Sequence, residues 1–146
     1  MKLISHRGNI SGPNPQKENH PNYILNALNK GYEVEIDVWY KDSCYWLGHD
    51  KPQYKTSVEF LKNDKFWCHA KNLKALDKMK NNPELNSRLN YFWHENDTVT
   101  LTSKGYIWAY PGKQPINNSI AVMPEINNDN ITQCKGICSD YKEKNK

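Results

Sequence analysis

The sequence has no run of apolar residues that approaches the roughly 20 residues of a membrane-spanning helix. Its beginning, Met-Lys-Leu-Ile-Ser-His, is typical of a strand that leads into a motif and lacks the longer apolar run of a signal peptide. We therefore expect a cytoplasmic protein without a membrane span, in which the thiols stay reduced.

Paired cysteines and low-complexity linkers are also missing. Cys134 and Cys138 are four residues apart, and the other two cysteines, Cys44 and Cys68, form no matching second pair, so the cysteines predict no zinc site. No repeat or linker divides the chain. Residues 1–146 are therefore expected to form a single domain, which at this length can bury a sizeable core.

Charge of one sign is not concentrated anywhere except at 142–146, which we expect to be a solvated tail. The net charge of +4 is scattered along the chain. A mild positive balance favours an anionic substrate such as a phosphate ester, but the concentrated basic face of a nucleic-acid binder is missing. A basic binder of nucleic acid or polysaccharide that uses exposed aromatic rings would need those rings on one positive strip, and nothing places them there. We expect no nucleic-acid partner.

Short apolar and aromatic runs are what the sequence does contain. They predict strands at Lys2–His6, Glu33–Tyr40, Tyr45–Gly48, Phe66–Ala70, Tyr91–His94, Tyr106–Tyr110, Ser119–Met123 and Gly136–Ser139. Helices are predicted at Pro21–Asn29, Ser57–Asn63, Leu73–Asn81 and Asn128–Cys134. Alternation of strands and helices indicates an α/β fold with parallel βα units.

The length of the chain limits how complete such a fold can be. Eight full βα units need about 250 residues, and the connections at 98–105 and 111–118 are too short for long helices. We therefore expect a reduced TIM-like (β/α) barrel of seven or eight strands with some helices missing. The short connection at 41–44 predicts a small β-hairpin after the second strand.

Ionisable residues gather at the carboxyl ends of the predicted strands, where a barrel brings them to one face. His6, Glu35, Asp37, His49 and His69 all occupy such positions. Glu35 and Asp37 are two residues apart on one strand, so their carboxylates point to the same side. Two adjacent carboxylates repel each other unless a cation lies between them, and such oxygen ligands suit Mg²⁺ or Ca²⁺.

Several linked motifs resemble one known family. They are Ile4-Ser5-His6-Arg7-Gly8, Glu18-Asn19-His20, Glu33-Val34-Glu35-Ile36-Asp37-Val38, Leu47-Gly48-His49-Asp50 and the closing Gly136-Ile137-Cys138-Ser139-Asp140-Tyr141. Their order and spacing are similar to those of the glycerophosphodiester phosphodiesterases, TIM-barrel enzymes of lipid metabolism. The match covers roughly the first third of the chain and its last strand.

The resemblance implies a role for each matching residue. His6 and His49 match the two catalytic histidines, and Arg7 matches the arginine that contacts the phosphate. Glu35 and Asp37 match two metal ligands. Histidine suits the proton transfers, because its pKa lies near 6.5. Glu18 is a candidate accessory residue, although an acidic residue at a helix start is also explained by capping and the helix dipole.

The third strand departs from the family's pattern of Glu-x-Lys. This chain has His69-Ala70-Lys71, so Lys71 is retained as a phosphate contact and the third carboxylate ligand is missing. Either His69 ligates the metal, which shifts the preference towards Mn²⁺ or Zn²⁺, or Glu95 on the next strand supplies the carboxylate.

The sequence thus predicts a metal-dependent phosphoric diester hydrolase that acts on small, glycerophosphodiester-like substrates. Attack by water and attack by a neighbouring hydroxyl, through a cyclic phosphate, both remain open. The alternative on the same fold is a weakly active or inactive module that binds a phosphorylated ligand, because the missing Glu and the shortened barrel both reduce catalytic power. Missing helices would leave part of the sheet uncovered, which also favours a homodimer.

Overall fold

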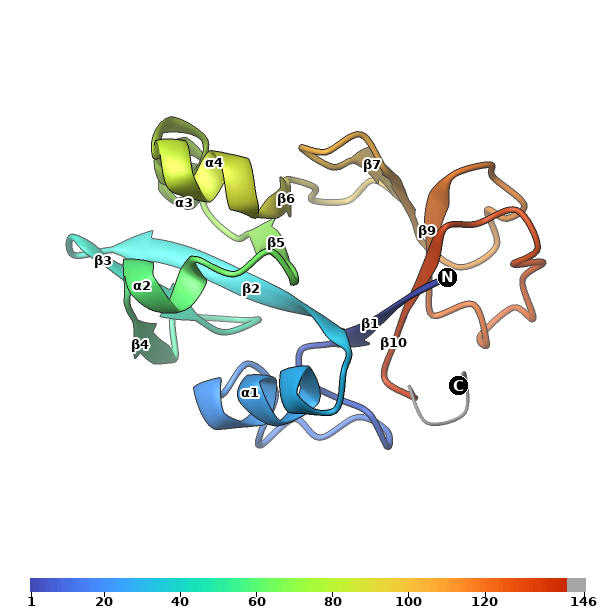
Figure 1. Cartoon of the computed structure of the whole chain (residues 1–146), viewed down its shortest axis with the longest axis horizontal. Helices are drawn as coiled ribbons and strands as arrows, with labels where there is room; N and C mark the ends of the chain where they lie inside the picture. The colour runs from blue at the N-terminus through green and yellow to red at the C-terminus, as the bar shows by residue number, and fades with distance from the viewer. Residues whose placement is uncertain (142–146) are drawn as a thin grey trace.

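The protein, described here by a computed structural model for residues 1–141, is a mixed α/β structure built on a strongly curled sheet with few helices (Figure 1). The strands are β1 (Lys2–His6), β2 (Glu33–Lys41), β3 (Cys44–Leu47), β4 (Tyr54–Thr56), β5 (Phe66–Ala70), β6 (Asn90–Phe92), β7 (Val99–Leu101), β8 (Ile107–Ala109), β9 (Ser119–Val122) and β10 (Gly136–Ser139). The helices are α1 (Pro21–Asn29), α2 (Val58–Leu61), α3 (Leu73–Asn81) and α4 (Pro83–Arg88). All eight strands expected from the sequence are confirmed within two residues at their ends.

Eight strands follow one another around the curl in the order β6-β5-β2-β1-β10-β9-β8-β7. All neighbours in this series are parallel except β7, which runs antiparallel to β8. Among the described residues no ladder joins β6 to β7. Single hydrogen bonds span the gap, such as Ser103 N to Tyr91 O at 2.8 Å and Thr100 Oγ1 to Trp93 O at 2.9 Å. The sheet is therefore strongly curled, but it is not a closed barrel, because its end strands β6 and β7 are not paired by a ladder.

The hairpin expected after the second strand is confirmed. The second half of β2 pairs antiparallel with β3, with Tyr40 opposite Tyr45. Asp42 and Ser43 turn the chain with φ of 53° and 61°, the positive values that a tight type I′ turn requires. β4 then adds an outer strand to β3. This hairpin brings the following residues, 48–50, back to the end of β2.

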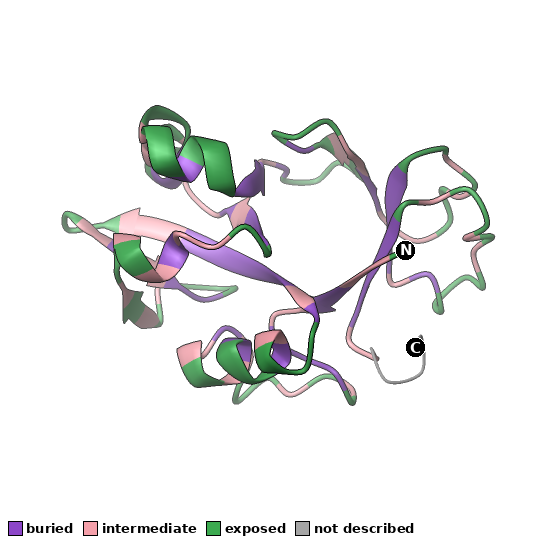
Figure 2. Ribbon diagram, in the orientation of Figure 1, coloured by how far each residue is buried: buried purple, intermediate pink, exposed green. Residues whose placement is uncertain are grey.

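Much of β2, β9 and β10 is buried (Figure 2). Two separate apolar cores lie on the two sides of the sheet. The outer core fills the space between the helices and strands β2 to β6, and it includes Ile24, Ile36, Met79 and Leu85. The inner core fills the inside of the curl with Ile4, Trp67, Phe92, Trp108, Ile120, Val122 and Cys138. Because strand side chains alternate, β5 contributes to both cores, with Phe66 and Cys68 in the outer core and Trp67 in the inner core.

Loops, rather than helices, cover the outer face of β8, β9 and β10. The outward side chains there include the small, buried Ala109 and Ala121. Ser119 Oγ donates to Ile116 O at 2.7 Å and Ser139 Oγ donates to Glu125 Oε1 at 2.6 Å, so the loops are bonded directly to the strands. The uncovered apolar face that favoured a homodimer is thus closed within one chain at these positions, and the homodimer stays a prediction.

The helix expected at Asn128–Cys134 is wrong, since this segment consists of turns. Asn130 Oδ1 accepts hydrogen bonds from Thr132 N at 3.0 Å and from its hydroxyl, and Asp129 Oδ1 accepts one from Gly112 N at 3.1 Å. Such short side-chain bonds to the backbone compete with helical hydrogen bonds.

Three short elements, β4, β7 and α4, were not expected from the sequence. No helix among residues 1–141 is long and apolar enough to cross a membrane. The basic cluster at 142–146 lies outside the described residues.

Candidate functional site

Strand register brings the predicted site residues together at one end of the curl. The pairing of β1 with β2 places His6 opposite Glu35, and the pairing of β2 with β5 places Asp37 opposite His69. Glu35 and Asp37 lie on the same face of β2 because they are two residues apart. Four side chains from three strands therefore meet at one mouth, as the sequence predicted.

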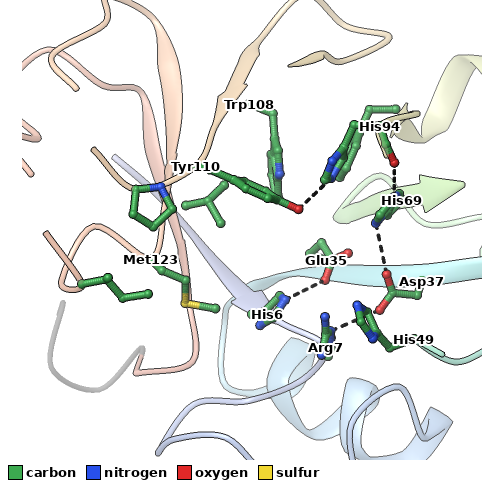
Figure 3. Close-up of a pocket in the computed structure, with 14 residues that line it drawn as sticks. His6, Arg7, Glu35, Asp37, His49, His69, His94, Trp108, Tyr110 and Met123 are labelled. Atoms are coloured by element: carbon green, nitrogen blue, oxygen red, sulfur yellow. Dashed lines mark hydrogen bonds and ion pairs between the residues drawn. The ribbon is translucent and has the colours of Figure 1, made fainter. Parts of the chain in front are cut away.

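These side chains open into a cavity of about 210 Å³ (Figure 3). Its polar wall is formed by His6, Arg7, Glu35, Asp37, His49 and His69. Trp108, Tyr110 and Met123 lie across the cavity from Asp37 and His49. The polar wall comes from the first half of the chain, and the facing wall comes from the second half.

Glu35, Asp37 and His69 form a candidate metal centre. One potential ligand atom from each lies within 4.8 Å of the other two. The carboxylates are buried, and Glu35 Oε1 and Asp37 Oδ1 have no hydrogen-bond partner. A buried carboxylate oxygen without a partner is costly, and a divalent cation satisfies two such oxygens at once. The donor set therefore fits a divalent cation.

The two carboxyls differ in acidity. Burial, together with repulsion from Asp37, raises the pKa of Glu35 well above its usual value. Burial would also raise the pKa of Asp37, but the interaction with the nearby His69 ring and the positive charge of Arg7 outweigh it, so this pKa is lowered. A cation beside both carboxylates would stabilise the ionised form of Glu35 as well.

One oxygen of Asp37 is fixed by protein groups, which leaves the other available. Asn19 Nδ2 donates to Asp37 Oδ2 at 2.9 Å, and Asp37 N donates to Asn19 Oδ1 at 2.9 Å. Arg7 Nε lies 3.3 Å from the same Oδ2. Oδ1 faces His69 Nδ1 at 3.3 Å. Asn19 is thus a positioning residue that the sequence contained, within Glu18-Asn19-His20, but to which no role was assigned.

His6 is held by a residue from the last strand's end. Its Nδ1 lies 2.8 Å from Asp140 Oδ1, and its Nε2 lies 3.8 Å from Glu35 Oε1. Burial would raise the pKa of Asp140, but the hydrogen bond and charge of His6 outweigh it, so the pKa of Asp140 is lowered. An ionised carboxylate only accepts hydrogen bonds, so Nδ1 carries a proton and Nε2 faces the cavity.

Arg7 is positioned by Glu18 and by its own backbone. Its φ of 59° is the left-handed conformation that few residues other than glycine adopt. Arg7 Nη1 donates to Glu18 Oε1 at 3.2 Å, while Glu18 Oε2 accepts from Asn14 N at 2.8 Å. Helix α1 begins later, with His20 as its N-cap and no acidic residue in its first turn. The capping explanation for Glu18 is therefore wrong, and Glu18 orients the guanidinium.

His49, Lys71 and Glu95 line a second cavity beside the central one. His49 is exposed, with its Nδ1 at 2.8 Å from Asp50 Oδ1. It borders both the central cavity and an adjoining one that Lys71 and Glu95 line. Glu95 is exposed and does not belong to the three-residue cluster found among the described residues. Of the two alternatives for a third ligand, the structure brings His69 to the carboxylates.

His94 and Tyr110 also line the cavity, and the sequence assigned neither of them a role. The ring of His94 stacks on that of His69 at 4.3 Å between centroids, and its Nε2 lies 3.0 Å from Tyr110 Oη. Burial and the charge of His69 lower the pKa of His94 to about 4, and burial raises the pKa of Tyr110 to about 12. Both are therefore neutral at pH 7. The sequence feature that could have indicated His94 is its position two residues after Phe92 at the end of an aromatic strand, which places both side chains on the same face.

Comparison of the chain with protein-family models, curated proteins and solved structures gave no match. The geometry of the site and the motifs in the sequence are therefore the features that indicate a function.

Proposed function

We propose that this protein is a metal-dependent phosphodiester hydrolase, built on a reduced TIM-like barrel of the type used by glycerophosphodiester phosphodiesterases. The observation that carries the proposal is the pair of buried carboxylate oxygens, Glu35 Oε1 and Asp37 Oδ1, that accept no hydrogen bond. They open into the same cavity as His6 and Arg7. A metal centre, a proton-transfer group and a phosphate-binding cation thus share one space.

Glu35, Asp37 and His69 would hold the cation. Three carboxylates would favour Mg²⁺ or Ca²⁺, whereas the imidazole of His69 shifts the preference towards Mn²⁺ or Zn²⁺. When bound, the cation supplies Lewis-acid stabilisation of charge on the phosphoryl oxygens.

The chain's own residues perform binding and proton transfer. The Arg7 guanidinium, held by Glu18, binds the phosphate, and Lys71 adds positive charge from the adjoining cavity. One histidine of the pair His6 and His49 accepts the proton of the attacking water or hydroxyl. The other donates a proton to the departing alkoxide as the phosphorus–oxygen bond breaks. His6 acts through Nε2, since Asp140 holds its Nδ1.

A second candidate is a module that binds a phosphorylated ligand without turnover. The exposure of His49 favours it, because 43% of this side chain is open to solvent and Asp50 holds its Nδ1. A catalytic group gains from a fixed position near the reacting atoms.

Hydrolysis of bis(p-nitrophenyl) phosphate with Mn²⁺, Zn²⁺, Mg²⁺, Ca²⁺ or EDTA tests the proposal. We expect metal-dependent release of nitrophenol that is lost in His6→Ala and Glu35→Gln. Glu59→Gln, at an exposed helical glutamate, is the matched control and should retain full activity. If wild-type protein releases no product with any metal but binds inorganic phosphate through Arg7, the binding module is the correct function.

A further inference from the structure

The central cavity has two walls of opposite character. Across from the ionisable residues, the facing wall is apolar and is formed by Trp108, Pro111, Val122, Met123 and Ile126. Figure 3 shows Met123 and Trp108 on the side away from Asp37. A phosphodiester has two substituents, so one of them faces this apolar wall when the phosphate lies against Arg7 and the metal centre.

The apolar wall offers almost no hydrogen bonds to a substrate. Its polar side-chain groups are the hydroxyl of Tyr110, which is already bonded to His94 Nε2 at 3.0 Å, and the indole N–H of Trp108. A polyol on this side would exchange its hydrogen bonds with water for at most that one indole donor, and each buried hydroxyl left without a partner would cost about 1–3 kcal/mol. No acidic side chain lines this wall among residues 1–141, so it also lacks the charge that would favour a cationic group.

A strained turn holds the wall in place at the mouth of the cavity. Met123 has a φ of 46°, an uncommon conformation for a residue other than glycine. Its backbone N donates to Cys138 O at 2.8 Å, and Ile126 N donates to Met123 O at 3.1 Å. This turn presents Ile126 with 67% of its surface exposed beside the cavity. Such strained conformations persist when the surrounding structure enforces them, and they concentrate at ligand sites.

From these observations we infer that the substrate is a phosphodiester with one uncharged apolar substituent, alkyl or aryl, bound against Trp108, Val122, Met123 and Ile126. The inference rests on the proposed function and gives its substrate class. The cavity of about 210 Å³ limits the enclosed part to a short chain or one ring. A longer chain leaves along Ile126. The sequence predicted only small, glycerophosphodiester-like substrates.

A series of glycerol phosphate diesters with methyl, butyl, hexyl and octyl groups tests the inference. We expect kcat/KM to rise up to about fourfold for each methylene until the cavity is filled, since a buried methylene contributes about 0.8 kcal/mol. Met123→Ser and Ile126→Ser should flatten this rise. Leu73→Ser, at an equally exposed leucine on α3, should leave it unchanged.

Charge is tested by a pair of substrates that have the same shape. We expect the neutral 3,3-dimethylbutyl diester to be hydrolysed faster than the choline diester, and the reverse order would overturn the inference of an uncharged substituent. Equal kcat/KM across the alkyl series would overturn the substrate class while leaving the proposed function intact.

Failure of the proposed hydrolysis can be distinguished from failure of the inferred apolar site. If no diester is hydrolysed with any metal, calorimetric binding of methyl, butyl and hexyl phosphate tests the wall directly. Affinity that increases with chain length in wild type, and increases less in Ile126→Ser, supports the apolar site. The same affinity for all three overturns it.

Discussion

The half of the sheet covered by helices and the half covered by loops contribute different chemistry to one cavity. Strands β1, β2 and β5, whose outer side packs mainly against helices, supply His6, Glu35, Asp37 and His69. Strands β8 and β9, covered by loops, supply the apolar wall, and the end of β10 adds Asp140. The two buried acidic residues among residues 1–141, Glu35 and Asp37, thus lie on a strand whose opposite face packs into the outer core.

Strand β2 explains how this arrangement is stable. Its outward residues Val34, Ile36 and Val38 are fully buried in the outer core, while Glu35 and Asp37 point inward between them. Burial of three aliphatic side chains stabilises the fold by about 1.5–3 kcal/mol each, which offsets the desolvation of the carboxylates on the other face. No strand of the loop-covered half has an aliphatic outer face of this length.

The largest expected effect concerns the metal donor set in the helix-covered half. We predict that His69→Ala lowers metal-dependent hydrolysis about 10³-fold, because a bound cation supplies several kcal/mol of stabilisation. His69→Glu should be active, and its ratio of activity with Mg²⁺ to activity with Mn²⁺ should be higher than in wild type, since three carboxylates favour the harder ion. Steady-state rates with each metal measure this. An unchanged metal preference in His69→Glu would show that His69 is not a metal ligand.

The second prediction separates packing from chemistry. Met79→Ala, on α3 in the outer core, should lower the free energy of unfolding by about 2–5 kcal/mol. Leu73→Ala, which is exposed on the same helix, should change it by less than about 0.5 kcal/mol. Urea unfolding measures both. The kcat of folded Met79→Ala should match wild type, and a parallel loss of kcat would show that the helices do more than support β2.

The third prediction tests the contribution of β10 to the polar wall. Asp140→Asn should lower kcat about 10–100-fold, because His6 loses the partner that orients its ring. The pKa of Asp140 is lowered in the folded state. Its stabilising effect is therefore present above its unfolded pKa of about 3.9 and is lost as the pH falls through the folded pKa. Urea unfolding from about pH 3 to 7 should show wild type more stable than Asp140→Asn at neutral pH, with the difference shrinking as the pH falls below about 3.9. A constant difference at all pH values would contradict this role.

The smallest expected effect concerns two glycines, one from the helix-covered half of the sheet and one from the loop-covered half. Gly8 has a φ of 94°, and an added Cβ would lie 2.6 Å from Tyr23 Cδ2, whereas Gly105 has a φ of 88° and open space around it. Gly105→Ala should cost only the backbone strain of about 1–2 kcal/mol, and Gly8→Ala should cost more because Tyr23 must also move. Thermal unfolding of both variants measures the difference. Equal costs would show that Tyr23 moves freely.

Much of the fold was predictable because its strands are short apolar runs with clear ends. The runs at Lys2–His6 and Phe66–Ala70 formed strands with the predicted ends. Helix α4 escaped prediction because Asn82 both ends α3 and caps the next helix. The helix predicted at Asn128–Cys134 did not form, because asparagine and aspartate side chains bond to the backbone there.

The candidate site was predictable where its residues are local in sequence. Glu35 and Asp37 share a strand face by spacing alone, and His6 ends a neighbouring strand. The pairing of His6 with Asp140 spans 134 positions, and no local pattern indicates such a contact. The apolar wall depends in the same way on how β8 and β9 face β2 across the curl, which only the three-dimensional structure gives.

Anomalous X-ray diffraction from crystals soaked in Mn²⁺ tests the central claim most directly. We predict one strong peak within about 2.0–2.3 Å of a carboxylate oxygen of Glu35, a carboxylate oxygen of Asp37 and a ring nitrogen of His69. The peak should be missing from crystals of Glu35→Gln soaked in the same way. A peak elsewhere, or none in the wild-type protein, would contradict the metal centre on which the proposed hydrolysis depends.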